Sequence, residues 1–158
     1  MTVSNRPEAP EDEPVLRRLI MQTVTEQLMA WSWPEPMREH LLEIQYTARR
    51  RAAHVNFPGG ESRIILADAQ NVGWVVVADL EDEVRLVEIM VLSEHRGKRI
   101  GSAIIDELLA AAARAGKPAR LNVAVLNSRA IALYQRLGFT RIGGDEVQHV
   151  MERAVERA

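Results

Sequence analysis

The sequence contains no cysteine and only two lysines, Lys98 and Lys117. The absence of cysteine excludes disulfides, thiolate metal sites and cysteine nucleophiles. No apolar run approaches the roughly 20 residues of a membrane span, and the polar start MTVSNRPEAPEDEP lacks the apolar core of a signal peptide. We therefore expect a cytoplasmic protein that does not interact with a membrane.

The chain also lacks a strong charge of one sign, since its formal net charge is −2. Nucleic-acid binding without sequence preference needs a basic field, so we expect no nucleic-acid partner and, at most, a local positive site. No carboxylate or histidine cluster has metal-ligand spacing, which predicts no metal. The 158 residues, 47% of them hydrophobic, suit one domain spanning residues 1–158, in which residues 1–12 are candidates for a flexible segment.

Two amphipathic helices are predicted in the first third of the chain. Residues 13–30 place apolar side chains at helical spacing, with acidic residues early, as the helix dipole prefers. The prolines in residues 31–36 interrupt this pattern, and a second helix is predicted over residues 37–53. Residues 1–13 show no clear strand pattern.

The rest of the chain alternates strand and helix patterns. Runs rich in β-branched residues predict three strands in a meander, a fourth strand and two short terminal strands. Between them, a helix begins at Ile100 and ends at Gly116, and a second helix over 128–137 is capped by Asn127. The predicted strands cover residues 61–68, 72–80, 84–92, 119–126, 139–142 and 146–153. This order predicts an α/β (α+β) fold with a mixed, mostly antiparallel sheet.

The turn between the third predicted strand and the following helix combines glycines with cations. It reads SEHRGKRIGSAII over residues 93–105, with Arg96, Lys98 and Arg99 close to Gly97 and Gly101. Backbone N–H groups without helical partners point outward at such a turn and favour an anion, for example a phosphate or pyrophosphate. The turn lacks the P-loop lysine pattern and the G-x-G-x-x-G pattern, so ordinary ATP and NAD cradles are not predicted. The alternative is a solvated basic turn.

Two stretches around this turn resemble the acetyl-CoA signature of the GNAT N-acetyltransferase superfamily. They are VRLVEIMVLSEHRGKRIGSAII and NVAVLNSRAIALYQRLGFTRIG, within residues 84–142. The superfamily loop, Gln/Arg-x-x-Gly-x-Gly/Ala, matches Arg96 first and Gly101 last, and the chain departs from it at Arg99, where a glycine is usual. The resemblance implies a GNAT-like domain with about six to seven strands, splayed at the cofactor site, and about four flanking helices.

The same resemblance implies an activity and its cosubstrate. The implied activity is that of an acetyl-CoA-dependent N-acetyltransferase, in which a primary amine of a small molecule or peptide attacks the thioester directly. The strand before the loop would pair with the pantetheine arm through its backbone, and the Val91 N–H would polarise the thioester carbonyl. The implied cofactor-binding residues are Ile89, Met90, Val91, Arg96, Gly97, Lys98, Arg99, Ile100, Gly101, Ser102 and Asn127, the last of which is equally explained as a helix cap.

Two side chains are candidates for proton transfer. Tyr134 falls where the superfamily places a tyrosine beside the thioester sulfur, as general acid; the alternative is packing on one face of its helix. Glu88 lies within an otherwise apolar strand, where burial would raise its pKa toward that of a useful general base, or else it faces solvent. His149 is a further candidate base, although a lone strand histidine is more often structural.

The acceptor and two other functions remain open in the sequence. Trp31 and Trp33 lie where the superfamily builds part of the acceptor wall, or they form a rigid turn. The ARRR run at 48–51 would attract an acidic substrate, or be a solvated helix face. A non-catalytic acyl-CoA-binding or sensing domain and an interaction domain are the alternative functions, and the chain is expected to be a monomer or a homodimer.

Overall fold

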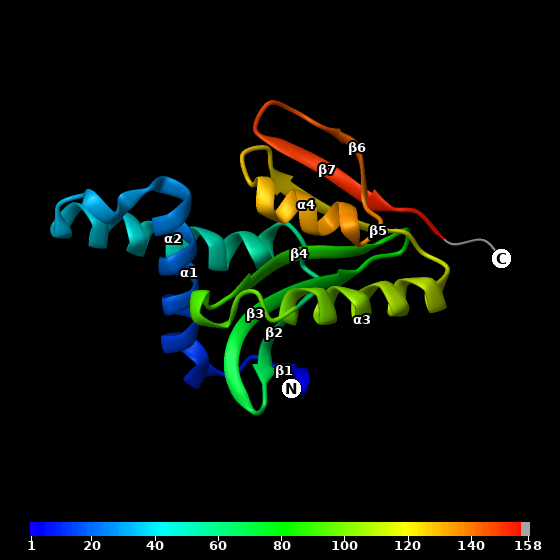
Figure 1. The fold of residues 1–158 in the computed structure, drawn as a ribbon, viewed down its shortest axis with the longest axis horizontal. Helices are drawn as coiled ribbons and strands as arrows, with labels where there is room; N and C mark the ends of the chain where they lie inside the picture. The colour runs from blue at the N-terminus through cyan, green and yellow to red at the C-terminus, as the bar shows by residue number, and fades with distance from the viewer. Residues whose placement is uncertain (156–158) are drawn as a thin grey trace.

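The computed structural model describes residues 1–155, which form one mixed sheet of seven strands and four α-helices (Figure 1). The sheet order is β1-β2-β3-β4-β5-β7-β6. The elements are β1 Val3–Pro7, α1 Glu13–Leu28, α2 Glu35–Val55, β2 Gly60–Ala67, β3 Gln70–Asp79, β4 Val84–Val91, α3 Ile100–Ala115, β5 Ala119–Ala124, α4 Ser128–Arg136, β6 Thr140–Gly144 and β7 Gln148–Arg153. These elements confirm the predicted α/β class with its mostly antiparallel mixed sheet.

The helices cover the two faces of the sheet in pairs. Leu16 and Ile20 of α1 pack with Trp74 of β3 in one apolar cluster, which α2 also joins. Ile105 of α3 and Tyr134 of α4 belong to the second cluster, on the other face. Figure 1 shows the ends of α1 and α2 that are joined to each other projecting beyond the sheet. The sheet therefore separates two cores, and both contribute to the same central strands.

The strand β1 was not predicted, and the interpretation of residues 1–13 as lacking a strand is wrong. These residues pair antiparallel with β2 from Val3 to Pro7. Only backbone groups form this ladder, and the short VSNRP run has no apolar alternation that could indicate it. Just beyond it, Asp12 is 3% exposed and accepts hydrogen bonds from the Arg6 guanidinium at 2.8 Å. A buried carboxylate with such a partner ties the segment to the core.

The sheet is splayed between β4 and β5. Their parallel pairing runs only from Val84 to Leu86 on β4, whereas β4 continues to pair with β3 as far as Val91. On the other side, β5 pairs with β7 along its full length. Beyond Leu86, β4 therefore has no hydrogen-bonded neighbour on its β5 side within the described residues, and the predicted splay is confirmed.

A bulge in β4 changes which side chains face each core. Val76 of β3 is opposite Glu88, but the next residue of β3 is opposite Leu86, so Val87 is the extra residue. Before the bulge, Leu86 packs in the cluster of α3 and α4; after it, Met90 packs in the cluster of α1 and α2. Because side chains alternate along a strand, Glu88 shares the α1–α2 side with Met90. The bulge thus aims a carboxylate toward α2.

We predict that Gly73→Ala destabilises the protein by about 3 kcal/mol, through overpacking against β4. A Cβ at this position of β3 would lie 2.5 Å from the Met90 carbonyl oxygen and 3.1 Å from Cδ1 of Ile65. A matched control is Gly143→Ala in β6, where a Cβ meets nothing within 4 Å. Urea unfolding monitored by Trp fluorescence measures both variants. Equal midpoints for the two would contradict the close approach of β3 and β4.

Candidate functional site

The free edge of β4 presents backbone groups to the gap between β4 and β5. The Leu92 N–H donates to the Val72 carbonyl at 2.8 Å, which makes these two residues a hydrogen-bonded pair of the β3–β4 ladder. In an antiparallel ladder, the adjacent residue turns its own N–H and C=O away from that partner strand. The N–H of Val91 therefore points toward the gap. The Val91 N–H is the group predicted to donate a hydrogen bond to a thioester carbonyl.

The turn after β4 exposes the start of α3. Gly97 has φ +77°, a conformation that favours glycine, and Arg99, the N-cap of α3, is also left-handed, with φ +61°. The Ala103 N–H donates to the Arg99 carbonyl at 3.1 Å and begins the helical bonding. The amides of Ile100, Gly101 and Ser102 precede this bond, so they have no helical acceptor. Arg99 thus occupies the position where the family loop usually has a glycine, and it adopts the left-handed conformation that a glycine would favour.

Arg96 connects this turn to α1. Its guanidinium donates to both carboxylate oxygens of Glu26 at 2.8 Å, and its Nε donates to the Val91 carbonyl at 3.3 Å. The Ser93 N–H makes a second link to α1, because it donates to the Gln22 side-chain oxygen at 3.0 Å. Arg96 therefore has a structural role in this arrangement. Its contact with a cofactor stays a prediction.

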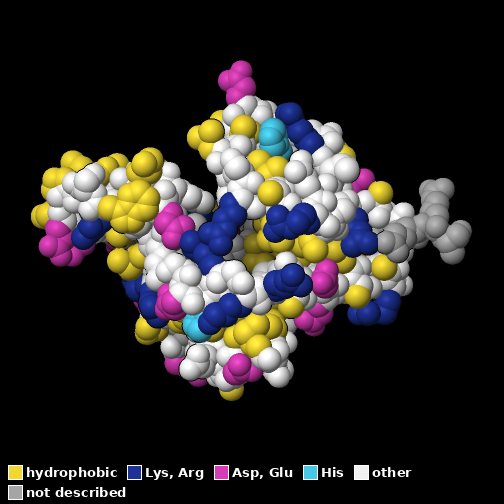
Figure 2. Space-filling view, in the orientation of Figure 1, with side chains coloured by type: hydrophobic (Ala, Val, Ile, Leu, Met, Phe, Trp, Pro, Cys, Tyr) yellow, Lys and Arg dark blue, Asp and Glu magenta, His cyan; other side chains and the backbone are white. Residues whose placement is uncertain are grey.

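A hollow of about 620 Å³ opens between the first turn of α3 and the end of α4. Figure 2 shows Lys and Arg side chains gathered around a hollowed part of this face. The hollow is lined by Arg99, Ser102, Ala103, Asp106, Arg136 and Leu137. Arg99 and Ser102 are among the predicted cofactor-binding residues, whereas Arg136 was not predicted, because it lies far along the chain in another helix. The positive charge at the start of α3 is therefore contributed by two elements.

Helix α4 places Tyr134 in the apolar core beside the gap. Asn127 caps this helix, because its side-chain oxygen accepts the Ala130 N–H at 3.2 Å. Tyr134 is 7% exposed, and its ring contacts Phe139 edge-on with centroids 5.9 Å apart. Burial raises the pKa of Tyr134 to about 12, and the charge of Glu88 adds to this effect. The phenol is therefore neutral throughout the physiological pH range.

Glu88 lies close enough to Tyr134 for the two groups to interact electrostatically. Burial raises the pKa of Glu88, while the positive charge of Arg49 and the Ile89 N–H act in the opposite direction. Arg49 comes from α2, on the side toward which the bulge turns this carboxylate. The two predicted proton-transfer residues, from β4 and α4, are thus within electrostatic range of each other, although Tyr134 belongs to the cluster of α3 and α4 and Glu88 to the α1–α2 side of the sheet. A carboxyl with a raised pKa can accept a proton nearer to neutral pH than an exposed one.

His149 occupies a different place. It is opposite Val123 in the β5–β7 ladder, and by strand alternation it shares the face of Met151. Both Val123 and Met151 belong to the apolar cluster of α3 and α4. Its Nδ1 is buried and has no hydrogen-bond partner among the described residues. A role as base stays a hypothesis, and the packing of this strand position equally explains the residue.

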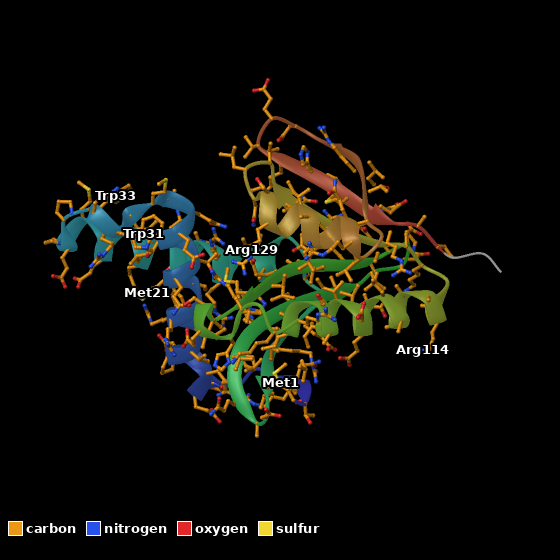
Figure 3. All side chains as sticks on the ribbon, viewed as in Figure 1. Met1, Met21, Trp31, Trp33, Arg114 and Arg129 are labelled. Carbon is orange, nitrogen blue, oxygen red and sulfur yellow. The ribbon has the colours of Figure 1, made fainter. Side chains whose placement is uncertain are left out.

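The tryptophans and the arginine run lie around the α1–α2 hairpin. Figure 3 places Trp31 and Trp33 at its projecting end, and Trp31 is 58% exposed. In the run at 48–51, Arg49 donates to Gln27, and Arg50 is half-buried, donating to Glu8 at 2.6 Å. Two of its three arginines are therefore held by other parts of the chain, so the run is more than a solvated helix face.

The described residues were also searched for metal-ligand groups and for membrane-spanning helices. Within residues 1–155, no three histidine, aspartate or glutamate side chains are grouped as potential metal ligands. In the same residues, no helix is both long and apolar enough to cross a membrane.

Comparison of the sequence with protein families identifies one matching model. The model of the "Acetyltransferase (GNAT) family" matches residues 21–139, which include the gap, the turn before α3 and Tyr134. A search of curated protein sequences finds no match.

Solved structures resemble this fold over nearly its whole length. The PaiA N-acetyltransferase of Thermoplasma acidophilum in complex with coenzyme A has a TM-score of 0.73 at 19% identity, covering 98% of this chain and 99% of that one. An acetyltransferase of Thermus thermophilus has a TM-score of 0.72 at 19% identity, covering 97% of each chain. The ribosomal-protein-S18-alanine N-acetyltransferase of Escherichia coli has a TM-score of 0.65 at 18% identity, covering 99% of this chain and 96% of that one. At these identities, the comparisons establish a common fold.

Proposed function

The chain belongs to the acetyltransferase (GNAT) family, and from this we propose that it transfers an acetyl group from acetyl-CoA to a primary amine of a small molecule or peptide. The observation that carries the proposal is the free edge of β4. Its Val91 N–H points into a gap, beside which lie the unbonded amides of α3 and the side chains of Tyr134 and Glu88. A neighbouring structure solved with coenzyme A supports an acyl-CoA as cosubstrate.

The residues present suit the parts of coenzyme A. The amides of Ile100, Gly101 and Ser102 would receive the pyrophosphate, since unbonded N–H groups at the start of a helix attract anions. Arg99 and Arg136, in the hollow between α3 and α4, would add positive charge for its remaining phosphate. The backbone of Ile89–Val91 would pair with the amide-containing pantetheine arm as an added strand does. Lys98 and Gly97 would complete the loop around the phosphates.

Acetyl-CoA supplies the acetyl group as an activated thioester. The Val91 N–H would donate to its carbonyl oxygen, where negative charge develops as the amine nitrogen forms its bond to the carbonyl carbon. Glu88 would accept the proton that the attacking amine loses, directly or through one water. Tyr134 would donate its proton to the sulfur as the carbon–sulfur bond breaks. The products are an amide and coenzyme A with its free thiol.

One observation favours a second candidate, an acyl-CoA-binding domain without transfer. A tyrosine with a pKa of about 12 is a weaker acid than an ordinary phenol. Its proton is less readily given to a thiolate with a pKa of ~8.5. Turnover with a panel of amines separates this candidate from an acetyltransferase, because both bind acetyl-CoA but only one consumes it.

We predict that acetyl-CoA and coenzyme A raise the melting temperature, whereas ATP and NAD do not. A ligand at 100 times its Kd stabilises the folded state by about 2.7 kcal/mol, and a domain of this size gains about 2–4 °C for each 1 kcal/mol, so the shift should be several degrees. Differential scanning fluorimetry with each ligand at millimolar concentration measures it. Equal shifts with all four ligands, or none, would contradict a coenzyme A site.

Gly101→Val provides the matched variant for this measurement. A Cβ at residue 101 meets nothing within 4 Å, so the unliganded protein should stay within about 0.5 kcal/mol of the wild-type stability. The added side chain would nevertheless occupy space next to the α3 amides that a phosphate must approach closely. The shift with acetyl-CoA should therefore shrink. An unchanged shift of the melting temperature with acetyl-CoA would contradict binding of the pyrophosphate at the start of α3.

A further inference from the structure

Helix α2 carries an apolar stripe on the side that faces away from the sheet. The residues of this outer stripe recur at helical spacing along the whole helix. They are Met37, Leu41, Ile44, Ala48 and Val55. Met37 is 59% exposed, Ile44 50% and Val55 62%. A surface helix normally keeps one apolar side, toward its own core, and a polar side toward water. The outer stripe is therefore a second apolar side.

The inner side of α2 is already occupied by the core. Leu42 and Ala53 are buried, and Tyr46 packs against the same cluster of α1 and β3. At 100° per residue, the mean direction of these three lies nearly opposite to that of the outer stripe. The outer stripe therefore plays no part in holding α2 on its own sheet. Its exposed apolar surface instead has the pattern of a helix that packs on a second helix.

The shape of the outer side also suits a helix. A shallow hollow, largely open to solvent, runs along α2 and is lined by residues of this helix and its cap, between His40 and Asn56. Ala48 and Ala52 line it near its middle and present only methyl groups. Small side chains at the centre allow two helices to approach closely, and flanking larger ones fit into grooves between side-chain rows.

Two charges at the border of the outer stripe favour a second α2 in the antiparallel direction. The first half of α2 carries Glu35, Glu39 and Glu43 together with Arg38, and in the second half Arg49 and Arg50 are bonded to Gln27 and Glu8 of the same chain, which leaves Arg51. A second α2 laid antiparallel would bring Glu43 of one copy near Arg51 of the other, whereas a parallel one would place each of these residues beside its own copy and so oppose like charges. Glu43 and Arg51 both line the outer hollow, so their charges lie at its border.

We propose that α2 is a dimerisation helix, which packs antiparallel on α2 of a second copy of this chain about a two-fold axis at the level of Tyr46 along the helix. Met37 of one copy then contacts Val55 of the other at each end, and Ala48 lies close to the axis. Two-fold pairs of this kind are self-complementary, as the apolar and charge patterns of α2 are. The inference does not depend on catalysis. It also gives the projecting α1–α2 hairpin a support that its own sheet does not provide (Figure 1).

Sedimentation velocity over about 1–300 μM tests the association. One helix stripe buries less than the roughly 800 Å² per partner of a standard interface, so we expect a reversible dimer in the micromolar range. Ile44→Lys should weaken association at least tenfold. The matched control is Ile142→Lys in β6, where the isoleucine is 51% exposed, and it should dimerise as the wild type does. A monomeric wild type at all concentrations would overturn the proposal. Loss of the dimer in Ile142→Lys alone would place the interface at the sheet edge and also overturn it.

Cross-linking tests the direction of the helices in a chain that has no cysteine of its own. Ala48→Cys should cross-link efficiently with a short bis-maleimide, because two copies of this position lie about 6 Å apart along the helix axes. Met37→Cys should not, because its two copies would be about 27 Å apart along the axes. Efficient cross-linking of both variants would indicate parallel helices and overturn the proposal. Failure of both variants to cross-link would also overturn the proposal.

Discussion

Glu88→Gln should lower kcat for acetyl transfer by about 10²- to 10³-fold, the usual contribution of a general base. The amide keeps the shape of the side chain but cannot accept a proton at neutral pH. KM for acetyl-CoA should change little, because the carboxylate is turned toward α2 rather than toward the α3 turn. Steady-state kinetics with a saturating amine and varied acetyl-CoA measure both parameters.

The pH dependence of this variant tests the role of Glu88 as base. Because burial raises the pKa of Glu88, wild-type kcat should rise with pH through a value above the ordinary carboxyl pKa of 4.5. Glu88→Gln should lose this rise. The folded state binds the proton of Glu88 more tightly than the unfolded chain does, so ionisation of Glu88 lowers stability as pH rises through this range. The glutamine variant should thus be at least as stable as the wild type at pH 7.

A matched control is Glu61→Gln on β2, whose carboxylate is exposed. This variant should retain wild-type kcat and the wild-type pH profile. Full activity in Glu88→Gln would assign the base elsewhere, and His149 would be the next residue to replace.

Tyr134→Phe should lower kcat by about 10- to 100-fold and leave KM for acetyl-CoA nearly unchanged. A thiolate is already a fair leaving group, so loss of the proton donor slows the reaction without abolishing it. The edge-on contact with Phe139 and the buried position remain available to a phenylalanine ring, so the melting temperature should hold. Kinetics, together with calorimetric titration of coenzyme A, separate transfer from binding.

The sequence has one other tyrosine, Tyr46, which provides the control. Its ring lies under the Arg17 guanidinium at 4.2 Å, so Tyr46→Phe should keep wild-type kcat. Because burial raises the pKa of Tyr134 to about 12, ionisation of this phenol should not reduce activity below about pH 10. An unchanged kcat in Tyr134→Phe would show that the thiolate leaves without this acid. Weaker coenzyme A binding with unchanged kcat would assign the residue to the cofactor.

Local signals in the sequence determined most elements and the start of the site. Gly116 and Gly138 adopt the left-handed conformation expected at helix ends, with φ of +66° and +90°. Asn127 caps α4 as predicted. The turn at 93–105 joins a strand to a helix, as its glycines and cations indicated. These features depend on neighbouring residues alone, so periodicity and capping chemistry suffice to find them.

The tertiary structure decided which distant groups meet. Strand β1 forms because its backbone pairs with β2, which lies far along the chain. No side-chain pattern in the sequence indicates this pairing. The bulge at Val87 and the early end of the β4–β5 ladder depend on register, and together they aim Glu88 at α2 while turning the Val91 N–H into the gap. Likewise, Arg96 meets Glu26 only because α1 packs beside the turn.

The outer stripe of α2 also depends partly on the sequence and partly on the tertiary structure. Its apolar spacing is visible in the sequence as part of an amphipathic helix, but the sequence alone does not tell which apolar residues enter the core. Packing of Leu42 and Ala53 against the sheet leaves Ile44 and Val55 exposed. Spacing along the chain therefore determines that a helix forms and where its apolar residues lie. Contacts between elements decide which of these apolar residues are buried and which remain available to a partner, because burial depends on neighbours far apart in the sequence.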